Sequence, residues 1–280
     1  MGAREGQPLG RSGRVKKLNN QRGEIARVFH PDEGFTPDAA AQVLIQVIGV
    51  VDLNCRLIMT GGGFIKIHAS GGQSSLNQLA TLAQRSASQI LERIPAKRSW
   101  DLCLGIDVVG GIGQFAALIR KDAQNVTIIW KSYPVGEEAR YLAGFGTVPG
   151  ARAPRFMQTG LGKTCVFVCH DAQAFNHRSQ ANVGRNGLTA RGAVVKEMTE
   201  TFSRERPAVA LNLVHWIEKL GNTRTFNTSY RTLYRDYNWH PKAYAAFGYS
   251  HTLSSSDLVE AINKMKWPDS PTTDVIVEWP

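Results

Sequence analysis

The chain has 280 residues, of which 42% are hydrophobic and 20% are charged, and its formal net charge is +10. A chain of this length can bury enough apolar surface to fold without disulfide or metal cross-links. No apolar run reaches the roughly 20 residues that a membrane helix needs, and the polar N-terminus lacks the apolar core of a secretory signal. We therefore expect a cytoplasmic protein that does not contact a membrane.

The beginning of the chain is strongly basic. Residues 1–27 carry seven basic and two acidic side chains, which is half of the net charge. Glycine, arginine, asparagine and glutamine dominate there, a composition typical of segments that bury too little apolar surface to fold. We predict a flexible basic arm over residues 1–22 and a single α/β domain over residues 23–280. The arm serves either as a solubilising tail or as a non-specific contact to nucleic acid.

Hydrophobic periodicity predicts strands that alternate with helices in the first part of the chain. A helix is predicted from residue 37 to 51, because Thr36 is a favourable N-cap and Pro37 fits the first helical turn. A second helix is predicted over residues 75–94 from its apolar stripe. The other predicted elements are strands at residues 25–29, 56–59, 102–109, 114–120, 126–130, 164–168, 209–214 and 273–278, and helices at residues 190–202 and 256–265.

The order of these elements predicts a mixed sheet covered by helices. The strand over residues 164–168 is apolar at every position except its first, as expected for a strand that is buried on both faces. One layered α/β domain is the simplest architecture that accommodates all of the predicted elements.

Reactive side chains follow three of the predicted strands. Glu33 lies just beyond the first strand, and Lys131 ends the fifth. The sixth strand ends at Cys169, which His170 and Asp171 follow. Because binding sites in open α/β sheets lie at the carboxyl ends of strands, these groups are candidates for one site. A carboxylate there would act as base toward the thiol, and an ammonium would stabilise an oxyanion.

Two of these segments resemble the nitrilase, or carbon–nitrogen hydrolase, superfamily. Residues 128–138 resemble its lysine segment, in which a strand ends in a catalytic lysine that Pro and Gly-Glu follow. Residues 166–171 are similar to its nucleophile segment, an apolar strand that ends in Cys, one variable residue and Asp. The resemblance implies an αββα sandwich and hydrolysis of an amide or nitrile C–N bond through a thioester on Cys169. It also implies that Lys131 supports the tetrahedral intermediate and that Glu137 or Glu138 orients the site.

The sequence departs from this family at one position. The family has a glutamate, its general base, at the end of the second strand, whereas this chain has glycine at residues 61–63. Glu33, at the end of the neighbouring first strand, is the predicted substitute in a site made of Cys169, Lys131, Glu33 and Glu138. The resemblance therefore leaves two functions open, an active amidase and an inactive relative that binds nucleic acid or a protein through its basic surface.

A segment late in the chain supports the binding alternative. Arg224, Arg231 and Arg235 are interleaved with aromatic residues, a pattern in which rings stack on bases while arginines hold phosphates. The same pattern also fits an aromatic core segment with surface arginines.

Residues 159–164, Thr-Gly-Leu-Gly-Lys-Thr, are similar to the end of a P-loop. Met157 stands where that motif needs its first glycine, and a strand is predicted where it needs a helix, so nucleotide binding is disfavoured. The four cysteines form no CxxC pair, and we expect neither a metal nor a cofactor. The expected partners are a small amide-type substrate, nucleic acid on the basic arm, and a second copy of the chain in a homodimer.

Overall fold

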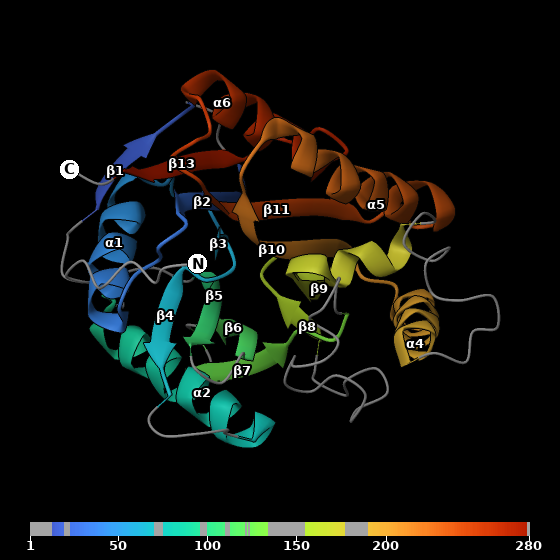
Figure 1. Cartoon of the computed structure of the whole chain (residues 1–280), viewed down its shortest axis with the longest axis horizontal. Helices are drawn as coiled ribbons and strands as arrows, with labels where there is room; N and C mark the ends of the chain where they lie inside the picture. Colours follow the sequence, from blue (N-terminus) through green and yellow to red (C-terminus); the bar gives the residue numbers. More distant parts are fainter. Residues whose placement is uncertain are drawn as a thin grey trace, which may run out of the picture.

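A computed structural model gives the fold of the chain (Figure 1). It describes residues 13–19, 23–69, 75–95, 100–109, 113–120, 122, 124–133, 155–176 and 190–278.

One half of a curled sheet comes from the first part of the chain together with its last strand. β13, β2, β3 and β5 run parallel in that order, and β6 and β7 continue the sheet antiparallel. β1 pairs with β13, and β4 pairs with β5. The bounds are β1 (Arg14–Lys17), β2 (Ile25–Pro31), β3 (Leu57–Thr60), β4 (Ile65–His68), β5 (Asp101–Val109), β6 (Gly113–Arg120), β7 (Asn125–Trp130) and β13 (Thr273–Glu278).

The other half of the sheet comes from the second part of the chain. β9, β10 and β11 run parallel, β8 forms a hairpin with β9, and β12 pairs with β11. The two halves join where the end of β11 pairs with the end of β2 at Gly248 and His30. The bounds are β8 (Phe156–Thr159), β9 (Gly162–Val168), β10 (Val209–Ile217), β11 (Lys242–Tyr249) and β12 (Lys266–Trp267).

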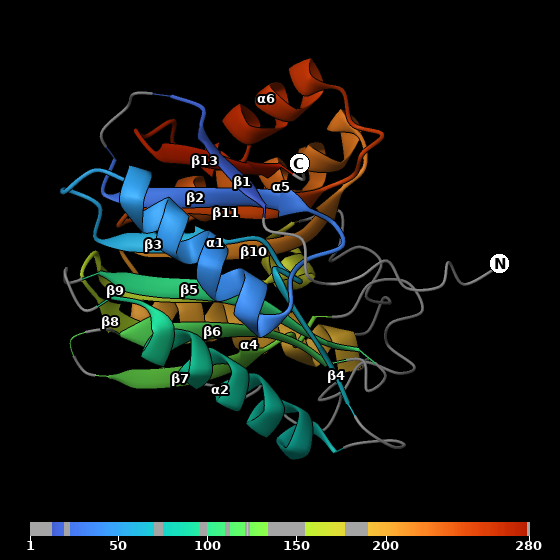
Figure 2. The same ribbon diagram turned by 90° about the vertical axis from the view of Figure 1, so that its left-hand side faces the viewer.

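Helices cover the outer face of each half. α1 and α2 lie over the first half (Figure 2), and α4 and α5 lie beside the second half (Figure 1). None of the helices in the described part of the chain is long and apolar enough to span a lipid bilayer. The bounds are α1 (Pro37–Val50), α2 (Leu76–Arg93), η3 (Cys169–Phe175), α4 (Ala190–Glu205), η4 (Leu220–Asn222), α5 (Thr223–Asp236) and α6 (Ser255–Lys264).

The core has two parts because strand side chains alternate between the two faces of a sheet. On β2, Ala26 and Val28 pack with the helices α1 and α2, whereas Ile25 and Phe29 belong to the core shared with the second half of the sheet. This helix–sheet–sheet–helix layering confirms the predicted αββα sandwich.

The predicted helix starts are also confirmed. The Thr36 side chain accepts a hydrogen bond from the backbone N–H of Ala39, and Ser75 and Gln78 form a capping box at the start of α2.

The structure differs from the predicted boundary of the basic arm. Residues 14–17 form β1, which pairs antiparallel with β13, although they lie inside the segment predicted to be flexible. Val15 packs against the core beneath α1. A single apolar residue in a basic run carries too weak a local signal to predict a strand whose partner lies at the far end of the chain.

The glycine-rich run that is similar to a phosphate loop forms the turn between β8 and β9. Thr159 pairs with Gly162 across this turn, and Gly162 has a φ of 94°, a conformation that favours glycine. The element that follows is strand β9 instead of the helix whose N-terminus a P-loop needs.

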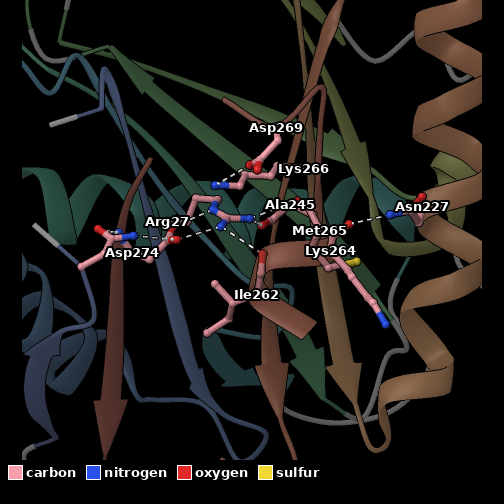
Figure 3. A network of polar contacts seen from close by, with 10 residues as sticks. Arg27, Asn227, Ala245, Ile262, Lys264, Met265, Lys266, Asp269 and Asp274 are labelled. Atoms are coloured by element: carbon pink, nitrogen blue, oxygen red, sulfur yellow. Dashed lines mark hydrogen bonds and ion pairs between the residues drawn. The ribbon is translucent and has the colours of Figure 1, made fainter. Parts of the chain in front are cut away.

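A buried arginine ties three strands and a helix end together (Figure 3). Arg27 of β2 is fully buried and donates two hydrogen bonds to the Asp274 carboxylate of β13, at 2.8 and 2.9 Å. Its other N–H groups donate to the carbonyls of Ala245, Met265 and Ile262. All five N–H groups of the guanidinium are thus satisfied, as a buried charge requires.

Candidate active site

Cys169 lies at the carboxyl edge of the sheet in a constrained backbone conformation. It directly follows β9, and its φ is 49°, in the left-handed region that non-glycine residues rarely adopt. Such a conformation costs on the order of 1 kcal/mol and is typical of functional turns. β9 pairs with β10 so that Val168 stands opposite Leu213, which puts Cys169 near the end of β10 as well.

A cavity of about 440 Å³ opens beside Cys169. It lies where strand ends of both halves of the sheet meet. Its wall combines the thiol, imidazoles, carboxylates and a lysine with two aromatic side chains. The lining residues are Asp32, Gly62, Gly63, Lys66, Asp107, Gln114, Cys169, His170, Val214, His215, Trp216 and Phe226.

A histidine and an aspartate from opposite halves of the sheet meet in this wall. Nε2 of His215, on β10, lies 2.7 Å from Oδ1 of Asp107, on β5. His215 Nδ1 is buried and has no hydrogen-bond partner of normal geometry. Burial by itself lowers the pKa of His215, but the charges of Asp107 and Cys169 and the hydrogen bonds to them outweigh burial and raise it to about 10.

The glycine run at residues 61–63 gives this pair its space. A Cβ on Gly62 would stand 2.7 Å from His215 Nδ1, and a Cβ on Gly63 would stand 2.8 Å from an Asp107 carboxylate oxygen. The backbone N–H of Gly62 also donates to the Val214 carbonyl, across the two halves of the sheet. The glycines that replace the expected glutamate therefore make room for an imidazole and a carboxylate from other strands.

The thiol of Cys169 is held near several positive groups. Its Sγ lies 3.1 Å from Nδ1 of His170. Burial by itself raises the pKa of the Cys169 thiol, but the positive charges of His170, Lys131 and His215 outweigh burial and lower the pKa well below its ordinary value. Burial raises the pKa of the Cys103 and Cys165 thiols instead. Of these three thiols, Cys169 is thus the one whose surroundings favour the thiolate.

Lys131 directly follows β7, as predicted, and the structure shows that it is buried. Its charge contributes to the lowered pKa of Cys169. The structure therefore brings Lys131 and Cys169 into one electrostatic environment.

Asp171 joins the turn after Lys131 to the turn that carries Cys169. Its Oδ1 accepts the backbone N–H groups of Ser132 and Tyr133 at 2.8 and 2.7 Å. Its Oδ2 accepts from the Arg155 guanidinium at 2.8 Å and from the backbone N–H of Val168 at 3.1 Å. With these four hydrogen bonds, Asp171 acts as an anchor for the two turns.

The carboxylates expected as partners of the thiol have different outcomes. The Glu33 side chain is exposed and is not among the residues that line the cavity, whereas its neighbour Asp32 is. Glu138, with Glu137, lies outside the described residues. Asp107 is the acid that contacts His215 in the cavity wall.

His215 and Asp107 are not among the site residues predicted from the sequence. His215 immediately follows the predicted strand at residues 209–214, so the rule that sites lie at strand ends could have indicated it. Asp107 lies inside a predicted strand, where a lone charge gave no sign of a partner 108 residues further along the chain.

No three His, Cys, Asp or Glu side chains in the described part of the chain are grouped so that they could hold a metal ion. The reactive side chains that line the cavity are one thiol, two imidazoles, two carboxylates and one ammonium group.

Solved carbon–nitrogen hydrolases share the fold. The carbon–nitrogen hydrolase of Helicobacter pylori G27 matches with a TM-score of 0.50 and 12% identity, over 90% of this chain and 79% of that one. The amidase of Nesterenkonia AN1, from the nitrilase superfamily, matches with a TM-score of 0.47 and 15% identity, over 82% of this chain and 79% of that one. No model of a known protein family and no curated protein matches the sequence. The chain has the fold of the carbon–nitrogen hydrolases, which confirms the predicted resemblance at the level of the fold.

Proposed function

We propose that the protein is a divergent member of the nitrilase superfamily and a thiol-dependent hydrolase of a non-peptide C–N bond. The observation that carries this proposal is the environment of Cys169. Its thiol has a lowered pKa and lines a cavity together with His170 and His215. A low-pKa thiol beside basic groups is the arrangement of an activated nucleophile.

The proposed reaction has two stages. The Cys169 thiolate attacks the carbonyl carbon of an amide, the C–S bond forms, and the carbonyl electron pair moves to oxygen. The Lys131 ammonium stabilises the developing negative charge. The C–N bond then breaks with transfer of one proton to nitrogen, and water hydrolyses the thioester to the acid. A nitrile would enter the same path through a thioimidate.

The cavity also indicates the size and polarity of the substrate. About 440 Å³ accommodates a small molecule. Trp216 and Phe226 offer apolar surface, whereas Asp32 and Lys66 offer charges of opposite sign. We infer a compact amide that carries a polar group next to its apolar part.

The proposal is tested by selective labelling and by product release. A limiting amount of iodoacetamide should modify Cys169 before the other three cysteines, as mapped by peptide mass spectrometry. A panel of small primary amides should contain one that releases ammonia in the presence of the wild-type protein and not with Cys169→Ala, and hydroxylamine should trap its thioester as a hydroxamate. Cys55→Ala, which removes another buried thiol, is the matched control. The proposal fails if Cys169 reacts no faster than the other thiols of the folded protein.

One observation favours the binding alternative as a second function. A groove of about 640 Å³ on α5 and α6 is lined by Arg224, Arg231 and Lys264. Three cations in one groove would attract the phosphates of a nucleic acid. Retention on single-stranded DNA that decreases with salt and with Arg224→Ala/Arg231→Ala supports this function, and unchanged retention in the double variant excludes this groove as its site.

A further inference from the structure

We propose that His215, held by Asp107, is the general acid and base of this site, in the role that the resemblance assigns to a glutamate where this chain has glycine at residues 61–63. The inference rests on the proposed hydrolysis at Cys169 and assigns its proton transfers to a named atom, Nδ1 of His215.

The two ring nitrogens of His215 have different surroundings. Nε2 is committed to Asp107 at 2.7 Å, which fixes the ring and its tautomer when the imidazole is neutral. Nδ1 is then the nitrogen left to exchange protons. It is buried without a partner of normal geometry, in a wall of the cavity that Cys169 also lines. A buried ring nitrogen without a partner of normal geometry calls for an explanation, and proton exchange in the cavity provides one.

The backbone beside His215 and Asp107 leaves space for their side chains. Gly62 and Gly63 are the positions at which any side chain would collide with His215 or Asp107. Gly63 also has a φ of 68°, which favours glycine on conformational grounds. Two consecutive residues thus lack side chains where the imidazole–carboxylate pair needs the volume.

His170 is the competing candidate, because its Nδ1 lies 3.1 Å from Sγ of Cys169. Its ring lies against Phe226 with the centroids 5.5 Å apart. The structure shows no carboxylate bonded to the His170 ring among the residues it describes. His170 can therefore stabilise the thiolate by its charge, whereas His215 has the fixed orientation that directed proton transfer requires.

The proton transfers balance over one turnover. In the resting site the thiolate of Cys169 faces the imidazolium of His215. When the thiolate has attacked the amide, His215 Nδ1–H donates its proton to the leaving nitrogen, so the amine departs neutral and the imidazole becomes neutral. Neutral Nδ1 then takes a proton from the water that attacks the thioester. Expulsion of the thiolate returns the pair to its starting charges, and the acid product ionises in solution.

The charge of the Cys169 thiolate affects the pKa of His215 differently in the two stages of the reaction. The negative charge of Cys169 is one of the causes that raise the pKa of His215. Acylation makes the sulfur neutral and removes that charge. The pKa of His215 then falls, because burial lowers it and the charge of Cys169 no longer opposes burial. His215 therefore accepts a proton from water as a neutral base in the second stage. The other charged and titratable groups that line this cavity are Asp107, His170, Asp32 and Lys66, and Lys131 and Tyr230 interact electrostatically with Cys169.

The test compares an amide with an activated ester of the same acyl group in His215→Gln and Asp107→Asn. An ester with a good leaving group acylates the thiol without a proton donor, whereas an amide does not. We expect His215→Gln to slow amide turnover by about 10²-fold or more, with a much smaller loss in the burst of alcohol released by the ester. Asp107→Asn should show the same selectivity, and ¹⁵N NMR should show the His215 pKa of the wild type falling after alkylation of Cys169.

His170→Gln and His68→Gln complete the experiment. His170→Gln should slow the amide and the ester alike, because it acts on thiolate formation, and His68→Gln, at an exposed histidine of β4, should change neither. Equal losses of amide and ester activity in His215→Gln, or a selective loss of amide activity in His170→Gln instead, would overturn the assignment of His215 as acid and base. Selective labelling of Cys169 would still support the hydrolase proposal in that case. If circular dichroism shows that His215→Gln does not fold, the selectivity of Asp107→Asn and the NMR titration of the wild type decide whether His215 is the acid and base.

Discussion

Two buried polar clusters of this protein differ in whether their hydrogen bonds are complete. Around Arg27, all five guanidinium N–H groups have acceptors, two of them on the Asp274 carboxylate. Around Cys169, the backbone is strained at a φ of 49°, and one ring nitrogen of His215 has no hydrogen-bond partner of normal geometry beside a cavity. The first cluster lies where strands are held together, and the second lies where they end.

This difference in hydrogen bonding is the one expected between a structural cluster, around Arg27, and a reactive cluster, around Cys169. A closed network gains stability from each added bond and offers nothing to a substrate. An open network keeps a nucleophile and proton-transfer groups accessible at some cost in stability, which is the usual condition of active sites. The two clusters should therefore respond oppositely to substitution, one in stability and the other in activity.

The largest expected effect is the loss of turnover in Cys169→Ala. Removal of a nucleophile costs on the order of 10⁴-fold or more in kcat, here measured as ammonia released from an amide. The thermal unfolding midpoint should change little, because the substitution removes one sulfur at the edge of the core. Residual activity within tenfold of the wild type would show that the thiol is not the nucleophile.

Arg27→Met should produce the opposite result. It leaves the Asp274 carboxylate buried without its charge partner, which costs about 3–5 kcal/mol in the free energy of unfolding. Urea denaturation measures this loss, and Arg27→Met/Asp274→Leu should recover part of it. Amide turnover per folded molecule should stay unchanged, and a specific loss of turnover would contradict the separation of the two clusters.

Gly62→Ala tests the space that the pair occupies. The new methyl group would stand 2.7 Å from His215 Nδ1 and push the ring from its position. A misplacement of about 1 Å costs about 10²-fold in rate. The matched control is Gly49→Ala on the exposed side of α1, where a Cβ meets nothing within 4 Å. That control should stabilise the protein by up to about 1 kcal/mol without changing turnover. Equal activity of the two variants would contradict the role of the glycine run.

The pH dependence of turnover is the smallest expected effect. The lowered pKa of Cys169 keeps the thiolate present well below the ordinary titration range of a thiol. His215 is protonated below its pKa of about 10 and loses the proton above it, so amide turnover should fall by about tenfold per pH unit beyond that value. Activated esters should show no such decrease, because their leaving groups need no proton. A profile that is flat for both substrates would exclude His215 as the acid.

Much of this protein was predictable from local signals. The N-caps, the apolar strands and the periodic helices predicted most elements to within a few residues, because local chemistry determines them. Cys169 and Lys131 were predictable as residues at the carboxyl edge of the sheet, since each directly follows a strand. The segment that became α5 and β11 was not assigned, because its aromatic and basic residues obscure any simple period.

Tertiary structure decided the rest. His215 and Asp107 lie on strands from different halves of the sheet, and no local pattern marks a pair that forms only when the two halves close. Arg27 appears in the sequence as one more charge of a basic segment, yet it is buried and paired with a residue 247 positions away. By itself, the sequence determined which residues reach the carboxyl edge of the sheet, since strand ends are local. The folded chain decided which of them meet, because the hydrogen bonds and volumes that join them are non-local.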